Sequence, residues 1–352
     1  MSKIMKSIYK LATGALLLGL FVSACQKEEL TAPDFKRETQ LLQPQSHELD
    51  KWILTEYTNP YNIEVIWRWN TKETSYRRNY IPPVEANVKP YLMILKGTFI
   101  KTYEDVMGKT FIKPLIPKQF HLLGEWGYNT NGTITLGQAE TGSKFTFYGV
   151  NHWSEKDATG DYPWIREAVH TMFHEFGHIL HQHKNFSEDF QKITKEHYTS
   201  TWNNESEKAA RVKGFMSNYS MLNHNEDFVE LIAFYTTLTQ EQWEARLNEG
   251  VVAAKNKEKI NKEVIKMEDA VKGRNAILTK ISMVKDYLKS SWGIDLDEIR
   301  EHALSNAQAC YANPEIFPSA STPTASSYAV MSPFTHNCTY CNHVQPKDVP
   351  QK

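Results

Sequence analysis

The spacing of hydrophobic and polar residues changes near residue 162 and predicts mainly strands before this point and helices after it. In the first part, alternating apolar residues predict strands over 61–69, 119–124, 132–137 and 144–150, and helical spacing predicts helices over 47–57 and 88–107. In the second part, apolar residues three and four apart predict helices over 163–182, 227–237, 240–248, 275–290 and 295–304. The dense Lys and Glu of 255–266 indicate one more, solvated helix face. This order is typical of the α+β class.

The N-terminal segment has the layout of a secretory signal. Lysines precede an apolar run over 11–24, which is too short and too abruptly ended for a comfortable membrane span. The run ends at Val22-Ser23-Ala24-Cys25, which resembles a bacterial lipobox. We therefore expect residues 1–24 to be removed as a signal peptide and Cys25 to be lipidated. The alternatives are a plain signal peptide or an anchor helix with a chance cysteine.

The segments that flank the expected domain predict its cellular location and its boundaries. Gln26-Lys27-Glu28-Glu29 looks like the export tag of Bacteroidota surface lipoproteins and predicts an outer-membrane lipoprotein exposed at the cell surface. Residues 25–46 are polar, contain prolines and predict a flexible tether, whereas 305–352 are expected to form a loose tail. The folded domain is then expected over 47–304.

Charge and cysteine usage exclude some functions. A net charge of −1 over 352 residues provides no field that would gather nucleic acid, so we expect no such partner. Without Cys25, three cysteines remain, an odd number for an oxidising compartment: Cys310, Cys338 and Cys341. The single CxxC of the tail is a weak indication of a metal site or a redox role, and a disulfide or an incidental sequence explains it better.

The segment with the clearest chemistry is His174-Glu175-Phe176-Gly177-His178. His174 and His178 stand four apart on a predicted helix, project from one face and can share one metal ion. Glu175 can hydrogen-bond a water on that metal and act as its general base, so the HExxH arrangement predicts a site for one zinc ion. The remaining histidines of this segment are expected on the helix surface or in support of the ligands: His170, His181 and His183.

A third ligand must come from elsewhere in the chain. The metzincin pattern requires a glycine three residues and a histidine six residues after His178, but His181 and Lys184 stand there. A following helix offers Glu226 and Glu230, four apart on one face within an apolar run. Glu226 can coordinate the metal, and Glu230 can hydrogen-bond a ligand histidine and hold its tautomer.

Two family resemblances follow from these residues. The HEFGH segment, then Tyr219, then Glu226-Asp227-Phe228-Val229-Glu230 is similar to the gluzincin catalytic domain of anthrax lethal factor, which implies Tyr219 as a hydrogen-bond donor to the transition state. From the lipobox to about Leu304, the chain also resembles the substrate import-associated zinc metallohydrolase lipoproteins, which are found beside outer-membrane nutrient import systems. Three short motifs contribute to this second resemblance: Pro60-Tyr61-Asn62-Ile63, Pro117-Lys118, and Leu136-Gly137 with Ala139-Glu140.

The resemblances imply a zincin-like α+β metallopeptidase, with a small mixed sheet before the active-site helix and a helical C-terminal part. The implied reaction is zinc-dependent hydrolysis of peptide bonds, with a peptide or protein substrate, the outer membrane and an import complex as partners. If 144–150 forms the edge strand beside the cleft, an extended peptide can pair with it. The alternative function is a zinc-containing binding lipoprotein of an import system without turnover. Such a protein would require neither Glu175 nor Tyr219.

Overall fold

The computed structural model describes residues 47–70, 80–128, 134–135, 137–140, 143–157 and 161–317. The expected signal peptide, Cys25, the tether, Cys338 and Cys341 lie outside these ranges. The chain divides into two units, Met1–Leu54 and Thr55–Lys352. In the described part of the first unit, helix α3 (Glu48–Ile53) carries a pair between Lys51 and Glu48 at 2.9 Å. No helix in the described ranges is both long and apolar enough to cross a membrane.

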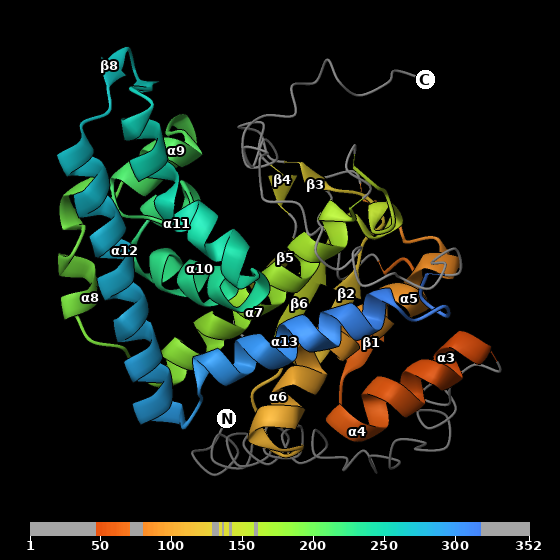
Figure 1. Cartoon of the computed structure of the whole chain (residues 1–352). Helices are drawn as coiled ribbons and strands as arrows, with labels where there is room; N and C mark the ends of the chain where they lie inside the picture. The colour runs from red at the N-terminus through yellow and green to blue at the C-terminus, as the bar shows by residue number, and fades with distance from the viewer. Residues whose placement is uncertain are drawn as a thin grey trace, which may run out of the picture. The chain divides into compact units, whose positions relative to one another are not determined.

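The second unit has strands mainly before residue 150 and helices after it (Figure 1). Its first part contains η1 (Leu54–Thr58, which begins at the last residue of the first unit), α4 (Asn59–Tyr61), β1 (Glu64–Ile66), α5 (Glu85–Leu95), η2 (Lys96–Ile100), α6 (Lys101–Met107), β2 (Gln119–Leu122), β3 (Gly127–Tyr128), β4 (Ile134–Thr135), β5 (Gly137–Glu140), β6 (Lys144–Phe147) and η3 (Val150–His152). Its second part contains α7 (Pro163–His183), α8 (Asp189–Lys192), η4 (Lys195–His197), η5 (Trp202–Asn204), α9 (Glu207–Val212), η6 (Tyr219–Met221), α10 (His224–Thr237), α11 (Gln240–Lys255), β7 (Lys259–Ile260), β8 (Glu263–Val264), α12 (Met267–Tyr287), η7 (Leu288–Trp292) and α13 (Leu296–Tyr311). The α+β prediction is confirmed, with helices predominating.

The main sheet corrects one prediction. Its strand order is β1-β2-β6-β5, in which β1, β2 and β6 run parallel and β5 is antiparallel to β6. The strand expected at the edge over 144–150 is β6, which lies inside the sheet, so its proposed pairing with a peptide is wrong. All four residues of β6 are buried, as is usual for a strand with neighbours on both sides.

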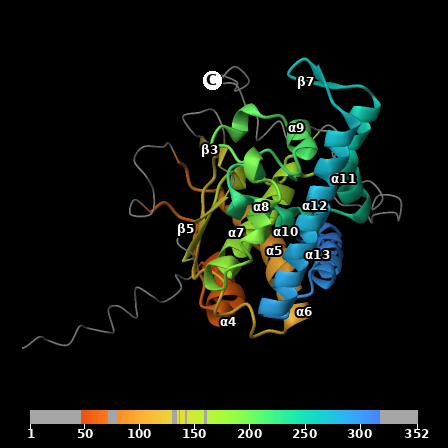
Figure 2. The same ribbon diagram turned by 90° about the vertical axis from the view of Figure 1, so that its left-hand side faces the viewer.

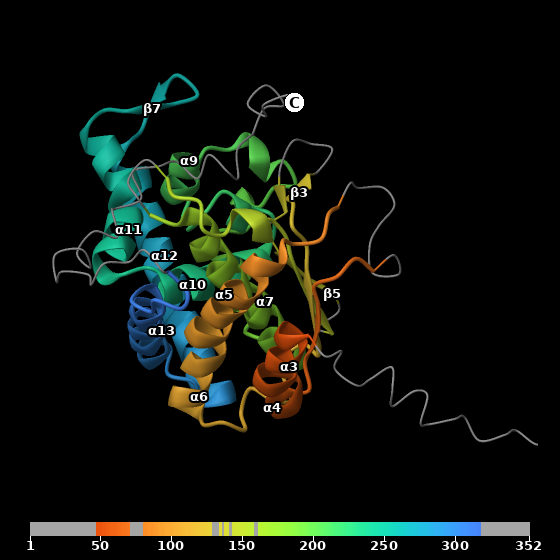
Figure 3. The same cartoon turned by 90° about the vertical axis from the view of Figure 1, so that its right-hand side faces the viewer.

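The helix that carries the histidines is held by an aromatic core. Figures 2 and 3 show the sheet on one side, α5 and α7 next to it, and α10, α12 and α13 farther away. Phe99 of η2 contacts Phe173 and Phe176 of α7, with ring centroids 5.1 and 5.4 Å apart. All three rings are fully buried. Phe173 and Phe176 lie on a different face of α7 from the histidines. Their burial in this core therefore directs the histidine face of the helix away from it.

The segment 255–266 is a second correction. Helix α11 ends at Lys255, and the chain reverses through the antiparallel strands β7 and β8 instead of forming a solvated helix. Asn261 and Lys262 join these strands with φ values of 50° and 71°. Two consecutive residues with positive φ match the twist of a tight hairpin turn, and charge density alone does not reveal such a turn.

Two helices are longer than expected. Helix α12 begins at Met267 and packs against α9 through Gly273, where a Cβ atom would lie 2.2 Å from the carbonyl oxygen of Val212. Helix α13 continues to Tyr311, and its last turn carries the buried Cys310. Packing against neighbouring elements thus extends both helices through residues with a weak helical pattern.

Gly177 allows α10 to lie close to α7. A Cβ atom at this position would stand 3.0 Å from Cγ1 of Val229 and 3.3 Å from Cδ1 of Ile232. Both residues belong to α10 and are fully or almost fully buried. The glycine therefore sets how closely the two helices can pack.

Gly177→Leu is expected to lower the free energy of unfolding by about 1–3 kcal/mol because the added side chain overpacks this contact. Gly177→Ala is the matched control, since its single methyl group requires a shift of only a few tenths of an ångström. Chemical denaturation of both variants measures the difference. Equal stability of the two variants would contradict the close contact.

Candidate metal centre

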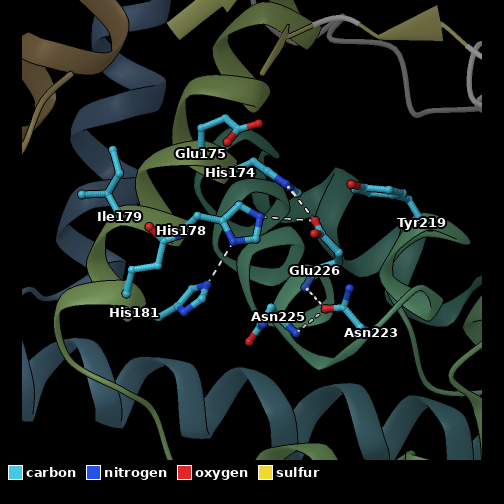
Figure 4. A pocket seen from close by; sticks show the side chains of 10 residues that line it. His174, Glu175, His178, Ile179, His181, Tyr219, Asn223, Asn225 and Glu226 are labelled. Atoms are coloured by element: carbon cyan, nitrogen blue, oxygen red, sulfur yellow. Dashed lines mark hydrogen bonds and ion pairs between the residues drawn. The ribbon is translucent and has the colours of Figure 1, made fainter. Parts of the chain in front are cut away.

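Two histidines of α7 face one carboxylate of α10. His174 and His178 are four residues apart, and Figure 4 shows both imidazoles directed at Glu226. Oε2 of Glu226 lies 3.2 Å from Nε2 of His174 and 3.3 Å from Nε2 of His178. The structure thus brings together the three residues expected to hold a metal.

These separations fit a zinc ion. Ligand atoms about 2.0–2.1 Å from a tetrahedral zinc ion lie about 3.3 Å from one another. The two separations between the histidine nitrogens and the Glu226 oxygen, 3.2 and 3.3 Å, match this value. Two imidazoles and one carboxylate also form a known zinc donor set that leaves the fourth position open for chemistry. A second group of potential ligands, His170, His174 and Glu230, has N–O separations of 2.9 Å. This shorter distance is typical of hydrogen bonds, so we interpret the second group as support for the first.

The carboxylate of Glu230 accepts hydrogen bonds from three residues. Its Oε1 accepts hydrogen bonds from Nε2 of His170 and Nδ1 of His174, both at 2.9 Å, and its Oε2 accepts one from the Ser217 hydroxyl at 2.5 Å. Burial opposes ionisation, but the two imidazoles outweigh it and hold the pKa of Glu230 well below its usual range. With the proton of His174 on Nδ1, its Nε2 lone pair is free for a metal.

His178 has a different partner. Its Nδ1 lies 2.9 Å from Nε2 of His181, three residues farther along α7. Burial lowers the pKa of His181 to about 4, so this ring is neutral at pH 7 and can accept the proton of His178. The third extra histidine, His183, contacts the backbone carbonyl of Ile179 instead and lies on the helix surface.

The first turn of α10 is fixed by its cap. The side-chain oxygen of Asn223 accepts hydrogen bonds from the backbone N–H groups of Asn225 and Glu226, at 2.8 and 3.1 Å. Glu226 therefore lies where the helix dipole favours an anion. Burial opposes its charge, but His174 and His178 prevail and lower its pKa to about 2. Our sequence reasoning missed Asn223, although an asparagine directly before a helix is a cap signal. It also missed Ser217, which has no such local signal.

A buried ion pair next to Glu226 anchors the same turn. Lys280 of α12 lies 2.6 Å from Asp227, and both side chains are almost completely inaccessible. Asp227 also accepts a hydrogen bond from Tyr198 at 2.9 Å, and Lys280 donates one to the carbonyl of Gly214 at 2.9 Å. Burial raises the pKa of Asp227 to about 6, against the opposing effect of Lys280. The start of α10 is thereby tied to α12 and to the segment before η6.

Glu175 and Tyr219 line the same cleft as the three potential ligands. The Tyr219 ring lies between His174 and Trp202, with centroid separations of 5.9 and 4.9 Å. Figure 4 shows its hydroxyl directed toward the Glu226 carboxylate. Burial and the nearby carboxylates raise the pKa of Tyr219, so its hydroxyl keeps a proton that it can donate.

The segment before Tyr219 is held by a buried charge network. Glu207 lies between Arg211 and Arg246, at 2.5 and 2.8 Å. The other oxygen of Glu207 accepts the backbone N–H of Asn218 at 3.2 Å, and Arg246 donates to the carbonyl of Met216 at 2.8 Å. These bonds fix the backbone on the N-terminal side of Tyr219.

The cleft over these residues has a volume of about 340 Å³. Besides the three potential ligands, Glu175 and Tyr219, its described lining consists of Ile179, His181, Gln182, Asn223 and Asn225. The lining is unusual for a small-molecule pocket because apolar side chains commonly predominate there.

Comparisons with known proteins give the family of this chain. A family model described as "Putative zinc-binding metallo-peptidase" matches residues 42–297. The chain belongs to this family. The crystal structure of a putative zinc-binding metallo-peptidase from Bacteroides caccae is 32% identical, with a TM-score of 0.59, and the match covers 76% of this chain and 94% of that chain. No match was found among curated proteins.

The family match spans both helices of the candidate metal centre. It gives zinc as the expected metal and a peptidase as the expected class of enzyme. The resemblance to lethal factor, the lipid anchor and the association with import stay predictions, because the two matches concern none of them.

The role of His181 generates a prediction about zinc affinity. His181→Leu removes the acceptor for Nδ1 of His178, so the dissociation constant for zinc is expected to rise by about 10–100-fold. Competition with a chromophoric chelator measures this constant. His183→Leu, two residues farther along α7, serves as the control and is expected to bind zinc normally. Equal zinc affinity of the two variants would contradict the role of His181 as a support for His178.

Proposed function

We propose that this protein hydrolyses peptide bonds with one zinc ion held by His174, His178 and Glu226. The supporting observation is the convergence of both histidine Nε2 atoms on one oxygen of Glu226, at 3.2 and 3.3 Å, inside a cleft that Glu175 also lines. When bound, zinc supplies Lewis-acid chemistry, since it lowers the pKa of a water and polarises a carbonyl group.

Three side chains of the site have separate roles in the proposed reaction. Glu175 takes a proton from the attacking water and returns it to the nitrogen of the leaving amine. Tyr219 donates a hydrogen bond to the carbonyl oxygen as negative charge develops there. Glu230 keeps the proton of His174 on Nδ1 and so keeps its Nε2 available as a ligand.

The rival function is a zinc-containing lipoprotein that binds its substrate without cleaving it. It would use the same three ligands. The two functions differ in their need for Glu175 and Tyr219, because holding a metal requires neither a base nor a donor to a developing oxyanion. The presence of both side chains at the cleft favours the peptidase.

Glu175→Gln is expected to retain zinc and lose cleavage by a factor of about 10²–10⁴, because the amide cannot accept the proton of the water. Zinc content is measured by mass spectrometry, and turnover by product analysis of a mixed peptide library. If the parent protein holds zinc and cleaves nothing, the binding function replaces this proposal. Absence of zinc from the parent would remove its basis.

Tyr219→Phe tests the second role in the same assay. Loss of the hydroxyl is expected to lower kcat about 10²–10³-fold with little change in KM, because the hydrogen bond forms mainly in the transition state. Trp202→Phe, which keeps an aromatic ring beside Tyr219, controls for disturbed packing. A rise in KM with unchanged kcat would instead make Tyr219 a substrate-binding residue.

We further propose that Cys25 anchors the enzyme to the outer membrane, at the cell surface, where it supplies peptides to a nutrient import complex. Support comes from the sequence: a basic start, an apolar run and the lipobox-like Val22-Ser23-Ala24-Cys25, followed by an acidic segment. A lipid chain with a polar tether places a soluble domain beside the membrane without a spanning helix.

Cys25→Ser is expected to move the protein from the membrane fraction to the soluble fraction, since no acyl chain can then be attached. Fractionation with immunoblotting measures this shift, and protease treatment of intact cells reports surface exposure. Cys310→Ser is the matched control. Continued membrane association of the Cys25→Ser protein would exclude this anchor.

A further inference from the structure

The cleft wall beside the candidate metal centre consists of hydrogen-bonding side chains. Asn223 and Asn225 enter it from the start of α10, and Gln182 from the end of α7. The single apolar residue in its described lining, Ile179, is only 2% exposed and so contributes almost no surface. Apart from the groups at the metal centre, a substrate group that enters here therefore meets three side-chain amides and the imidazole of His181.

These amides have hydrogen-bonding capacity to spare. The side-chain oxygen of Asn223 is used in capping α10, but no described residue accepts from its NH₂ group. The side-chain amides of Asn225, which is partly buried, and of Gln182, which is exposed, have no hydrogen-bond partner among the described residues. Water satisfies such groups in an open cleft, and a bound substrate must replace that water.

The described lining of the cleft also has no positively charged lysine or arginine. An acidic side chain would therefore find no partner in this lining. Its carboxylates belong to Glu175 and Glu226, and both serve the proposed reaction. A large apolar side chain would displace water without replacing its hydrogen bonds, at a cost in rate of about tenfold for each group left unpaired.

We propose that the enzyme prefers peptides with a neutral hydrogen-bonding side chain, an amide or a hydroxyl, beside the scissile bond. This inference rests on the proposed peptidase function and specifies its substrate class. Asn225 and Gln182 are the specificity-determining residues, since each offers both a donor and an acceptor.

The test compares matched peptides. Cleavage sites are first located with a peptide library, and peptides are then made with Gln, Ser, Leu, Glu or Lys at each position flanking the cut. The full-length enzyme is expected to favour Gln or Ser over Leu by about tenfold or more in kcat/KM at one of these positions. Preference for Leu, Glu or Lys at both positions would overturn the inference and leave the peptidase function standing.

The variants Gln182→Leu and Asn225→Leu test whether these two residues of the cleft wall cause the preference for Gln over Leu. Either change is expected to lower the Gln-to-Leu ratio of kcat/KM by about tenfold. A ratio within one protein cancels any general loss of activity, and zinc content checks that the centre remains intact. Asn275→Leu, an exposed amide of α12 outside the cleft lining, should leave the ratio unchanged.

Two further outcomes are decisive. Unchanged ratios in both wall variants would overturn the assignment of these residues even if the parent prefers Gln. If the zinc-loaded parent cleaves no peptide, the inference fails together with the proposed function. The specificity claim fails while the peptidase function stands when cleavage occurs with the wrong preference, or when both wall variants keep the ratio of the parent.

Discussion

The close packing of α7 against α10 is the constraint on which the candidate metal centre depends. Gly177 removes the one side chain that would separate the helices, and Val229 occupies the space. On each helix the polar residues are four positions apart and lie on one face. When the two helices pack together, the two histidines of α7 therefore face the two glutamates of α10. Glu226 then faces both Nε2 atoms, and Glu230 reaches the opposite side of the His174 ring. A wider separation of the helices would break both sets of contacts together.

The two histidines are supported unequally. His174 donates to a carboxylate that is itself held by His170 and Ser217, whereas His178 donates to the neutral ring of His181. A carboxylate partner increases the basicity of an imidazole more than a neutral acceptor does. His174 is thus expected to be the stronger donor to a metal. His181 also lines the cleft, so a ligand bound in the cleft can contact the residue that supports His178.

The sequence allowed the local parts of this arrangement to be predicted, but not its long-range parts. His174 and His178 follow from the helical period, and Glu226 with Glu230 from the need for one further ligand on a helix with an apolar face. The inner position of β6 depends on β5, which pairs with it through residues that carry no strong strand pattern. Ser217 contacts Glu230 of a later helix, and no local pattern predicts this contact. Glu207 has a local partner in Arg211, but its contacts with Arg246 and Asn218 arise only on folding. The hairpin at Asn261 was missed because backbone conformation, not charge, decides it.

The buried charges around the centre are better explained by geometry than by stability. Replacing a buried ion pair by apolar residues often leaves the stability of a protein unchanged. The pair of Lys280 and Asp227 is therefore expected to add little to the free energy of unfolding. Its hydrogen bonds, however, fix the residue next to Glu226, and those of Glu207 fix the backbone next to Tyr219. Directional bonds hold a segment in one position, whereas apolar contacts permit small shifts. A site that must hold its groups within about 0.5 Å of a working geometry therefore benefits from charged supports that its core alone would not require.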